Sequence, residues 1–166
     1  IKELRLNMTP KKENAVGNVG AGTGATVGKY FGDEFSMKGG LGTASIKTGE
    51  LVVAALVVVN CLGDVIDPKT GDIIAGALNE TKTDFANTIE IIKKGTIINK
   101  SFGGNTTIGI VATNGYLSKS GAGRVASMAH NGFARTIRPV HTMFDGDTIF
   151  CLSLGSVETD VSTIGA

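Results

Sequence analysis

The chain alternates long apolar runs with polar, glycine-rich connections. Its longest apolar run, residues 51–60, consists almost entirely of Val, Leu and Ala and predicts a strand that is covered on both faces. Two further runs, residues 107–113 and 148–154, predict two more strands of the same kind. Residues 73–77 predict a short partner strand that follows a turn at residues 67–72.

One long helix is predicted between the last two of these strands. Ser118 or Ser120 is suited to cap its start, and Pro139 ends it. The positions that recur at helical spacing on its apolar side are Val125, Met128, Ala129, Gly132 and Phe133. Strands that alternate with helices in this way imply a layered α/β body.

Two segments carry weaker patterns. Between residues 17 and 49 glycines alternate with small residues, which indicates loops and tight strands. Residues 78–100 are polar and predict a surface excursion with one or two helical turns. Residues 2–6 resemble the tail of a helix.

Composition narrows the range of partners. The chain has 166 residues, 42% of them hydrophobic, which is enough for one core and one domain. A net charge of +1, 5% aromatic residues and no tryptophan exclude the usual features of nucleic-acid binding. The longest apolar run is too short to cross a bilayer. We therefore expect neither a nucleic-acid partner nor a membrane.

The cysteines and histidines do not predict a metal site. Cys61 and Cys151 lie inside apolar runs, as reduced core residues of a cytoplasmic protein do. His130 and His141 are too far apart for a local zinc motif. His130 is expected to pack on the helix, and His141, close to Asp145, could support a site without belonging to it. We predict no metal and no cofactor.

The glycine-rich residues 17–29 do not form a nucleotide-binding motif. Val27 stands where a dinucleotide fingerprint needs its third glycine, and Tyr30 stands where a phosphate loop needs Ser or Thr. Lys29 therefore has two interpretations. It is either a solvated surface lysine or a functional amine that the small neighbouring residues allow to approach a reacting group.

Other polar residues mark the ends of the predicted strands. Asn60 either caps a turn or supplies an amide donor to an oxyanion hole. Asp145 and Asp147, separated by one glycine, either form a hairpin turn or place two carboxylates beside an amine and a hydroxyl. A calcium loop is excluded because its remaining ligand positions are absent.

The bond between Asn105 and Thr106 opens the second long strand. The Thr106 hydroxyl can attack the Asn105 carbonyl, and hydrolysis of the resulting ester frees Thr106 as a new N-terminus. That threonine then carries a nucleophilic hydroxyl together with an α-amine that can act as its base. Alone, an Asn-Thr pair is also an ordinary entry to a strand.

Four blocks of the sequence resemble one family, the L-aminopeptidase/D-esterase (DmpA) peptidases. They are residues 17–29, 55–60, 105–114 and 141–150, in family order. The nylon-oligomer hydrolase branch is especially similar, because it too has Asn-Thr at a cleavage point and Asp-Gly-Asp near the end. The branch with a serine nucleophile has Ser-Gly-acid there instead.

The resemblance implies an α/β/β/α sandwich that is incomplete in this chain, and a self-cleaving amidohydrolase. Thr106 is the implied nucleophile and Asn60 the oxyanion donor. Lys29 would assist the nucleophile, while Asp145 and Asp147 would orient its amine and hydroxyl. Implied substrates are small peptides, amides, esters or nylon-like oligomers, whose identity the sequence leaves open.

The resemblance also concerns the extent of the protein. Family members are longer, with a whole N-terminal half ahead of the glycine block, so we expect this chain to be a fragment that exposes apolar surface. Residues 1–105 would end the α-chain and residues 106–166 would begin the β-chain after self-cleavage. A homo-oligomer, a tetramer or larger, is implied as well.

Two alternatives remain open at this stage. Ornithine acetyltransferases share the sandwich and cleave before a threonine, but transfer the acyl group to an amine. The other alternative is a scaffold or binding protein that keeps the fold and is never cleaved.

Overall fold

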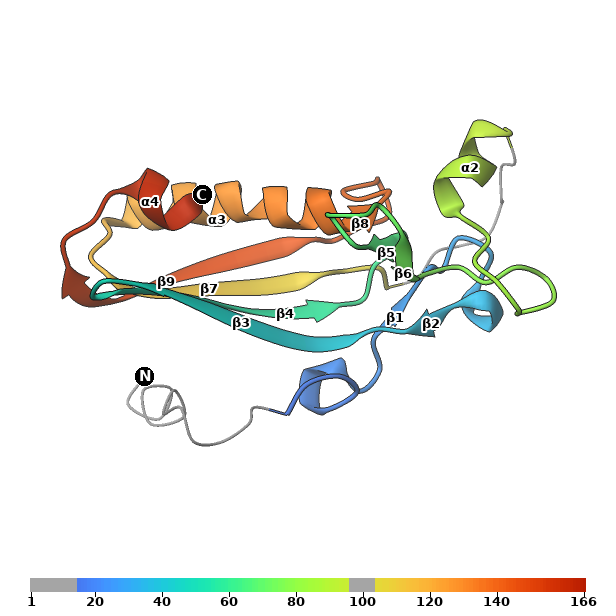
Figure 1. Cartoon of the computed structure of the whole chain (residues 1–166), viewed down its shortest axis with the longest axis horizontal. Helices are drawn as coiled ribbons and strands as arrows, with labels where there is room; N and C mark the ends of the chain where they lie inside the picture. The colour runs from blue at the N-terminus through green and yellow to red at the C-terminus, as the bar shows by residue number, and fades with distance from the viewer. Residues whose placement is uncertain (1–14, 96–103) are drawn as a thin grey trace.

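A four-stranded sheet forms the centre of the molecule (Figure 1). The computed structural model of the chain describes residues 15–95 and 104–166. Within them the sheet has the order β3-β4-β7-β9. Its strands are β3 Gly40–Thr48, β4 Leu51–Val59, β7 Ile108–Gly115 and β9 Thr148–Val157. β4 pairs antiparallel with β3 and with β7, whereas β7 and β9 are parallel.

The long helix α3 Lys119–Thr136 connects the two parallel strands, because parallel neighbours need a crossover connection. Of the two predicted caps the chain uses Ser118, whose hydroxyl accepts a hydrogen bond from the Gly121 N–H at 3.1 Å. Figure 1 shows α3 and the short α4 Val161–Gly165 together on one face of the sheet. Val125 and Phe133 of α3 are buried against the sheet, whereas Gly132 is exposed.

The opposite face of the sheet is not covered by a second layer within residues 15–95 and 104–166. Its exposed side chains include Leu56, Ile108, Phe150 and Leu152. The prediction of an α/β fold is confirmed, and the described residues supply one helix layer and one sheet of the implied sandwich. The expectation that β4 is covered on both faces is wrong for this part of the chain, since Leu56 is 40% exposed.

Shorter elements gather at one end of the sheet, beyond the end of β4 (Figure 1). Strands β5 Asp64–Ile66, β6 Ile73–Ala75 and β8 Ile137–Arg138 form a small sheet of order β6-β5-β8. β1 Thr26–Val27 pairs with β2 Met37–Lys38. The 3-10 turns η1 Gly20–Gly22 and η2 Asp33–Phe35 flank β1, and α2 Thr88–Lys93 is the helical turn predicted for the surface excursion. The proposed helix tail at residues 2–6 lies outside the described residues.

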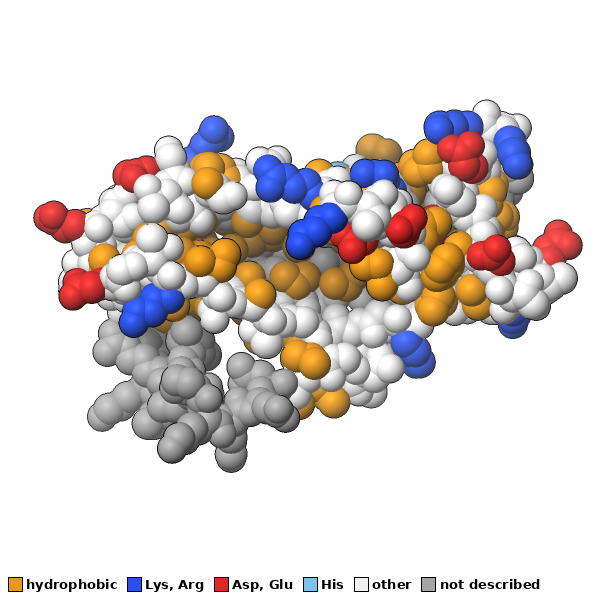
Figure 2. All heavy atoms as spheres, in the orientation of Figure 1, with side chains coloured by type: hydrophobic (Ala, Val, Ile, Leu, Met, Phe, Trp, Pro, Cys, Tyr) orange, Lys and Arg blue, Asp and Glu red, His pale blue; other side chains and the backbone are white. Residues whose placement is uncertain are grey.

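Both cysteines pack against the hydrophobic core. Cys61 is 1% exposed and packs with Val27, Phe133 and Ile137, as predicted. Burial raises the pKa of the Cys61 thiol to about 12. Cys151 is half-buried, and both thiols are free. Figure 2 shows hydrophobic side chains gathered along the middle of the molecule, between the helices and the strands.

Candidate active site

The predicted site residues meet where β4 ends and β7 begins. Because these strands are antiparallel, with Val58 opposite Ile108, the end of one lies beside the start of the other. Asn60 follows β4 directly, and the backbone N–H of Thr106 donates to the Asn60 carbonyl at 2.8 Å. A cleft of about 770 Å³ opens here, with Lys29, Asn60 and Thr106 in its wall.

Lys29 enters this junction from the glycine-rich segment. Gly28 before it has a φ of +69°, and a Cβ there would lie 1.9 Å from the Ala77 nitrogen, so only glycine fits. The Lys29 side chain is buried, and its Nζ lies 2.9 Å from Asn60 Oδ1 and 3.2 Å from the Gly104 carbonyl oxygen. Burial lowers the pKa of the Lys29 ammonium below its ordinary value. The interpretation of Lys29 as a solvated surface residue is therefore wrong.

The Asn60 side chain is held by three hydrogen bonds. Its Oδ1 accepts from Lys29 Nζ and, at 3.0 Å, from the backbone N–H of Thr26. Its Nδ2 donates to the Gly104 carbonyl oxygen at 2.6 Å. The amide nitrogen of Asn60 therefore points at the backbone that leads into the Asn105-Thr106 bond.

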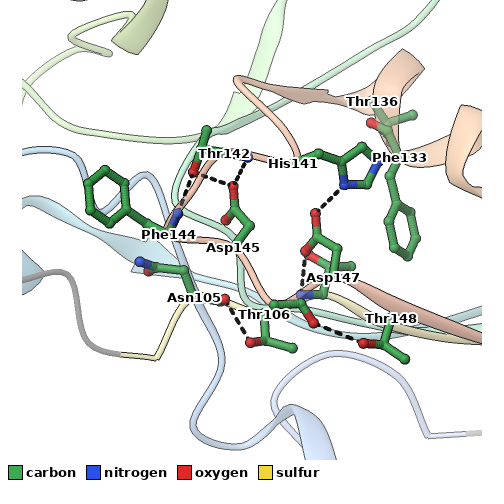
Figure 3. A network of polar contacts seen from close by, with 12 residues as sticks. Asn105, Thr106, Phe133, Thr136, His141, Thr142, Phe144, Asp145, Asp147 and Thr148 are labelled. Atoms are coloured by element: carbon green, nitrogen blue, oxygen red, sulfur yellow. Dashed lines mark hydrogen bonds and ion pairs between the residues drawn. The ribbon is translucent and has the colours of Figure 1, made fainter.

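The loop with both aspartates lies on the other side of this bond. It leads into β9, which is parallel to β7, so residues 145–147 run alongside residues 105–107 (Figure 3). Asp147 Oδ1 accepts from the backbone N–H of Thr107 at 2.8 Å. Asp145 Oδ2 accepts from the N–H and the hydroxyl of Thr142 at 2.9 and 2.7 Å.

The Thr106 hydroxyl donates to the carbonyl oxygen of its own neighbour Asn105 at 2.7 Å. Neither Asp145 nor Asp147 makes a hydrogen bond to Thr106 in the part of the chain that the structure describes. The structure thus brings all five predicted residues to one junction. A direct contact of either carboxylate with the amine or hydroxyl of Thr106 stays a prediction, for the cleaved protein.

His141 is a contributor to this junction that the sequence analysis left outside the site. Its Nδ1 lies 2.8 Å from Asp147 Oδ2, and the Asp147 side chain is 3% exposed (Figure 3). The His130 ring packs edge-on against the His141 ring, with the two ring centroids 4.9 Å apart. Burial, and then the neighbouring His141, lower the pKa of His130. The position of His141 six residues before Asp147 was the available signal.

The described residues offer no group of three His, Cys, Asp or Glu side chains that could hold a metal ion. Among the helices that the structure describes, none is both long and apolar enough to span a membrane. The groups that meet at this junction are an amide bond, a hydroxyl, a buried amine and two carboxylates.

Comparison with known proteins assigns the chain to a family. The model of peptidase family S58 matches residues 5–164. The chain belongs to peptidase family S58. An uncharacterized aminopeptidase of Mycobacterium leprae is 44% identical over 147 residues, which cover 87% of the chain and 38% of that protein. A 6-aminohexanoate-oligomer endohydrolase of Paenarthrobacter ureafaciens is 28% identical over 153 residues, covering 86% of the chain and 40% of that protein.

Solved structures share the fold of this S58 chain. A protein from Pyrococcus horikoshii OT3 superposes with a TM-score of 0.55 at 25% identity. The match covers 87% of the S58 chain and 34% of the Pyrococcus protein. The L-aminopeptidase D-Ala-esterase/amidase of Ochrobactrum anthropi, described as a variant of the Ntn hydrolase fold, gives 0.53 at 22% identity. That match covers 82% of the S58 chain and 32% of the neighbour. The resemblance to the DmpA peptidases is thereby confirmed.

Proposed function

We propose that the protein to which this chain belongs is a self-processing amidohydrolase with Thr106 as its N-terminal nucleophile. The observation that carries the proposal is the placement of the Asn105-Thr106 bond. Lys29 and Asn60 bind the backbone just before this bond. Asp147 binds the backbone just after it, and the Thr106 hydroxyl lies 2.7 Å from the Asn105 oxygen.

Each residue has a distinct role in the proposed turnover. After cleavage the α-amine of Thr106 accepts the proton of its own hydroxyl as that hydroxyl attacks a substrate amide. Asn60 Nδ2 donates to the oxyanion that forms. Burial lowers the pKa of Lys29, so its amine gives up a proton more readily than an exposed lysine and can assist proton transfer beside the nucleophile. Asp145 and Asp147 orient the new terminus, and water releases the acyl group.

The proposed substrates are small peptides, amides or nylon-like oligomers. The support is the family and its relatives, which include proteins named as aminopeptidases and as 6-aminohexanoate-oligomer endohydrolases. The proposal extends to a homo-oligomer of four or more subunits in the cytoplasm, which contains an N-terminal half ahead of the glycine-rich segment. Light scattering of the full-length protein measures the subunit number.

Intact mass of the full-length protein tests the nucleophile. Thr106→Ala removes the hydroxyl, so cleavage before residue 106 and amide hydrolysis are both lost. Thr106→Ser keeps a hydroxyl and retains part of each activity. Thr107→Ala, the matched control next to it, is still cleaved at the same bond. Cleavage in Thr106→Ala, or cleavage at another bond, overturns the assignment of Thr106.

The acceptor of the acyl group needs a separate measurement. Release of free acid from an amide substrate in the absence of any amine acceptor supports hydrolysis. Product that forms only with an added amine supports an acyltransferase of the ornithine acetyltransferase type. A full-length chain that stays uncleaved and inactive supports a scaffold.

A further inference from the structure

We propose that self-cleavage and substrate hydrolysis use different oxyanion donors. The backbone N–H of Gly146 serves the Asn105 carbonyl during self-cleavage, and the Asn60 amide serves the substrate afterwards. This inference rests on the proposed function, because it concerns the same nucleophile.

The uncleaved chain shows which donor faces which carbonyl. The Asn105 carbonyl oxygen accepts from the Gly146 N–H at 2.8 Å. This distance is within the range of about 2.7–3.1 Å that is expected of oxyanion donors. Asn60 Nδ2 instead binds the Gly104 carbonyl oxygen at 2.6 Å, one residue before the bond to be broken. Asn60 is therefore engaged elsewhere when the Asn105 carbonyl is attacked.

Position 146 comes unusually close to the nucleophile. A Cβ on Gly146 would lie 2.7 Å from Thr106 Oγ1, so a side chain here would displace the hydroxyl. Asn105 is 3% exposed, and in such a water-poor site a fixed N–H stabilises developing negative charge more than it does in water. A glycine amide thus combines a close approach with a rigid dipole.

The parallel pairing of the two segments holds this amide in place. Asn105 pairs with Asp145, and the next hydrogen bond of the same ladder runs from the Thr148 N–H to the Thr107 carbonyl at 3.0 Å. Asp147 Oδ1 binds the Thr107 N–H between them. The backbone on both sides of Thr106 is therefore fixed against the Asp145–Asp147 loop before cleavage.

The chemical step balances without a cofactor. Thr106 Oγ1 forms a bond to the Asn105 carbonyl carbon, and the carbonyl oxygen becomes the oxyanion facing Gly146. Collapse breaks the Asn105–Thr106 C–N bond, and the hydroxyl proton ends on the departing Thr106 nitrogen. Water then hydrolyses the ester, giving the Asn105 carboxylate and the free Thr106 hydroxyl.

Cleavage changes the partners of Lys29 and Asn60. Both bind the Gly104 carbonyl, which belongs to the segment that ends at Asn105. Departure of that segment frees Asn60 Nδ2 in the wall of the cleft and removes one of the acceptors of Lys29 Nζ, which keeps its bond to Asn60 Oδ1. A substrate carbonyl can then take the place of the Gly104 carbonyl.

Replacing single backbone amides by esters tests the Gly146 donor. Cell-free translation of the full-length protein with an α-hydroxy acid at position 146 removes this N–H without adding a side chain. Self-cleavage, followed by intact mass over time, should slow by about 10²–10³-fold relative to the natural chain. The matched control is the same replacement at Thr148, which removes the next ladder bond, and there we expect less than a tenfold change. Equal slowing by both esters, or none at 146, overturns the inference.

Asn60→Ala tests the second half of the inference. Its loss of amide hydrolysis, measured per cleaved chain, should exceed its loss of self-cleavage rate by at least about tenfold. Equal losses, or a fully uncleaved Asn60→Ala chain, would show that one donor serves both reactions. If the natural full-length chain is never cleaved before Thr106, the proposed function itself is refuted. This outcome is distinct from those that refute only the use of two oxyanion donors.

Discussion

The Nδ1 nitrogen of His141 lies 2.8 Å from the Oδ2 oxygen of Asp147. The other Asp147 oxygen binds the Thr107 N–H, so this carboxylate links the imidazole to the backbone just after Thr106. His141 has a φ of +53°, a left-handed conformation that is uncommon for residues other than glycine and in which His is one of the more frequent types. We infer that His141 is a positioning residue for Asp147.

His141→Ala should lower kcat about 10- to 100-fold and leave KM nearly unchanged. A hydrogen bond to a charged group contributes about 1.5–3 kcal/mol, and its loss frees the carboxylate to turn. Steady-state kinetics of the cleaved full-length enzyme measure both constants.

His141→Asn is the matched variant, because its Nδ2 occupies nearly the position of the imidazole Nδ1 and Asn tolerates positive φ. We expect it to recover most of kcat. Equal activity of His141→Ala and the natural enzyme, at equal thermal stability, would rule out the positioning role.

The sequence predicted the elements whose burial is strongly patterned. β4, β7, β9 and α3 have continuous apolar runs or a clear helical period, and each is present. β3 was not separated from its glycine-rich surroundings, because nearly all of its side chains are exposed and mostly small. It is a strand because of its nine paired positions with β4, from Gly40 opposite Val59 to Thr48 opposite Leu51, which no local pattern reveals.

The sequence also predicted only part of the candidate site. The convergence of Lys29 and Asn60 was predicted from the family resemblance, together with the glycine-rich segment before Lys29 and the position of Asn60 at the end of an apolar run. The contact between His141 and Asp147 depends on a left-handed backbone at His141, and the bond from Gly146 to Asn105 depends on backbone atoms alone. Neither feature could be predicted from the types of side chain in the sequence, because both depend on the conformation of the backbone.

Gly28→Ala should destabilise the protein by about 2–4 kcal/mol and lower its activity. The substitution combines a left-handed backbone with a Cβ that would lie 1.9 Å from the Ala77 nitrogen. Relief of that overlap moves Lys29 away from Asn60. Urea unfolding gives the stability change. Gly42→Ala is the control, since nothing lies within 4 Å of its added Cβ, and a comparable loss there would contradict the explanation.

The buried Asp64 should make stability depend on pH. It is 2% exposed and accepts from the Ala77 N–H and from both the N–H and hydroxyl of Thr88. Burial raises the pKa of Asp64 above 3.8, against the effect of these hydrogen bonds. The folded state therefore holds this proton at pH values where the unfolded state has released it.

It follows that the contribution of Asp64 to the free energy of unfolding falls as pH rises from about 3.8 through the raised pKa. Asp64→Asn should cost about 1–3 kcal/mol, because its amide nitrogen faces donors and cannot accept from them. The advantage of the natural protein over this variant should shrink with rising pH in urea titrations. Asp72→Asn, at an exposed site, is the control. An advantage that grows with pH would show that the pKa of Asp64 is lowered instead.

The uncovered face of the sheet should bind a hydrophobic dye in a protein that consists of these 166 residues alone. Strand pairing aligns Leu56, Ile110 and Phe150 on this face, and places Leu152 two positions further along β9. Phe150 and Leu152 are 56% and 36% exposed. Contiguous apolar surface of this kind marks contact sites for other protein layers.

The double variant Phe150→Lys, Leu152→Lys on the edge strand β9 should at least halve the dye fluorescence without unfolding the chain. Ile46→Lys is the matched control, because Ile46 is 74% exposed on the other edge strand and pairs with Val53 on the helix-covered face. If Ile46→Lys lowers the fluorescence as much as the double variant does, the dye does not report on the uncovered face.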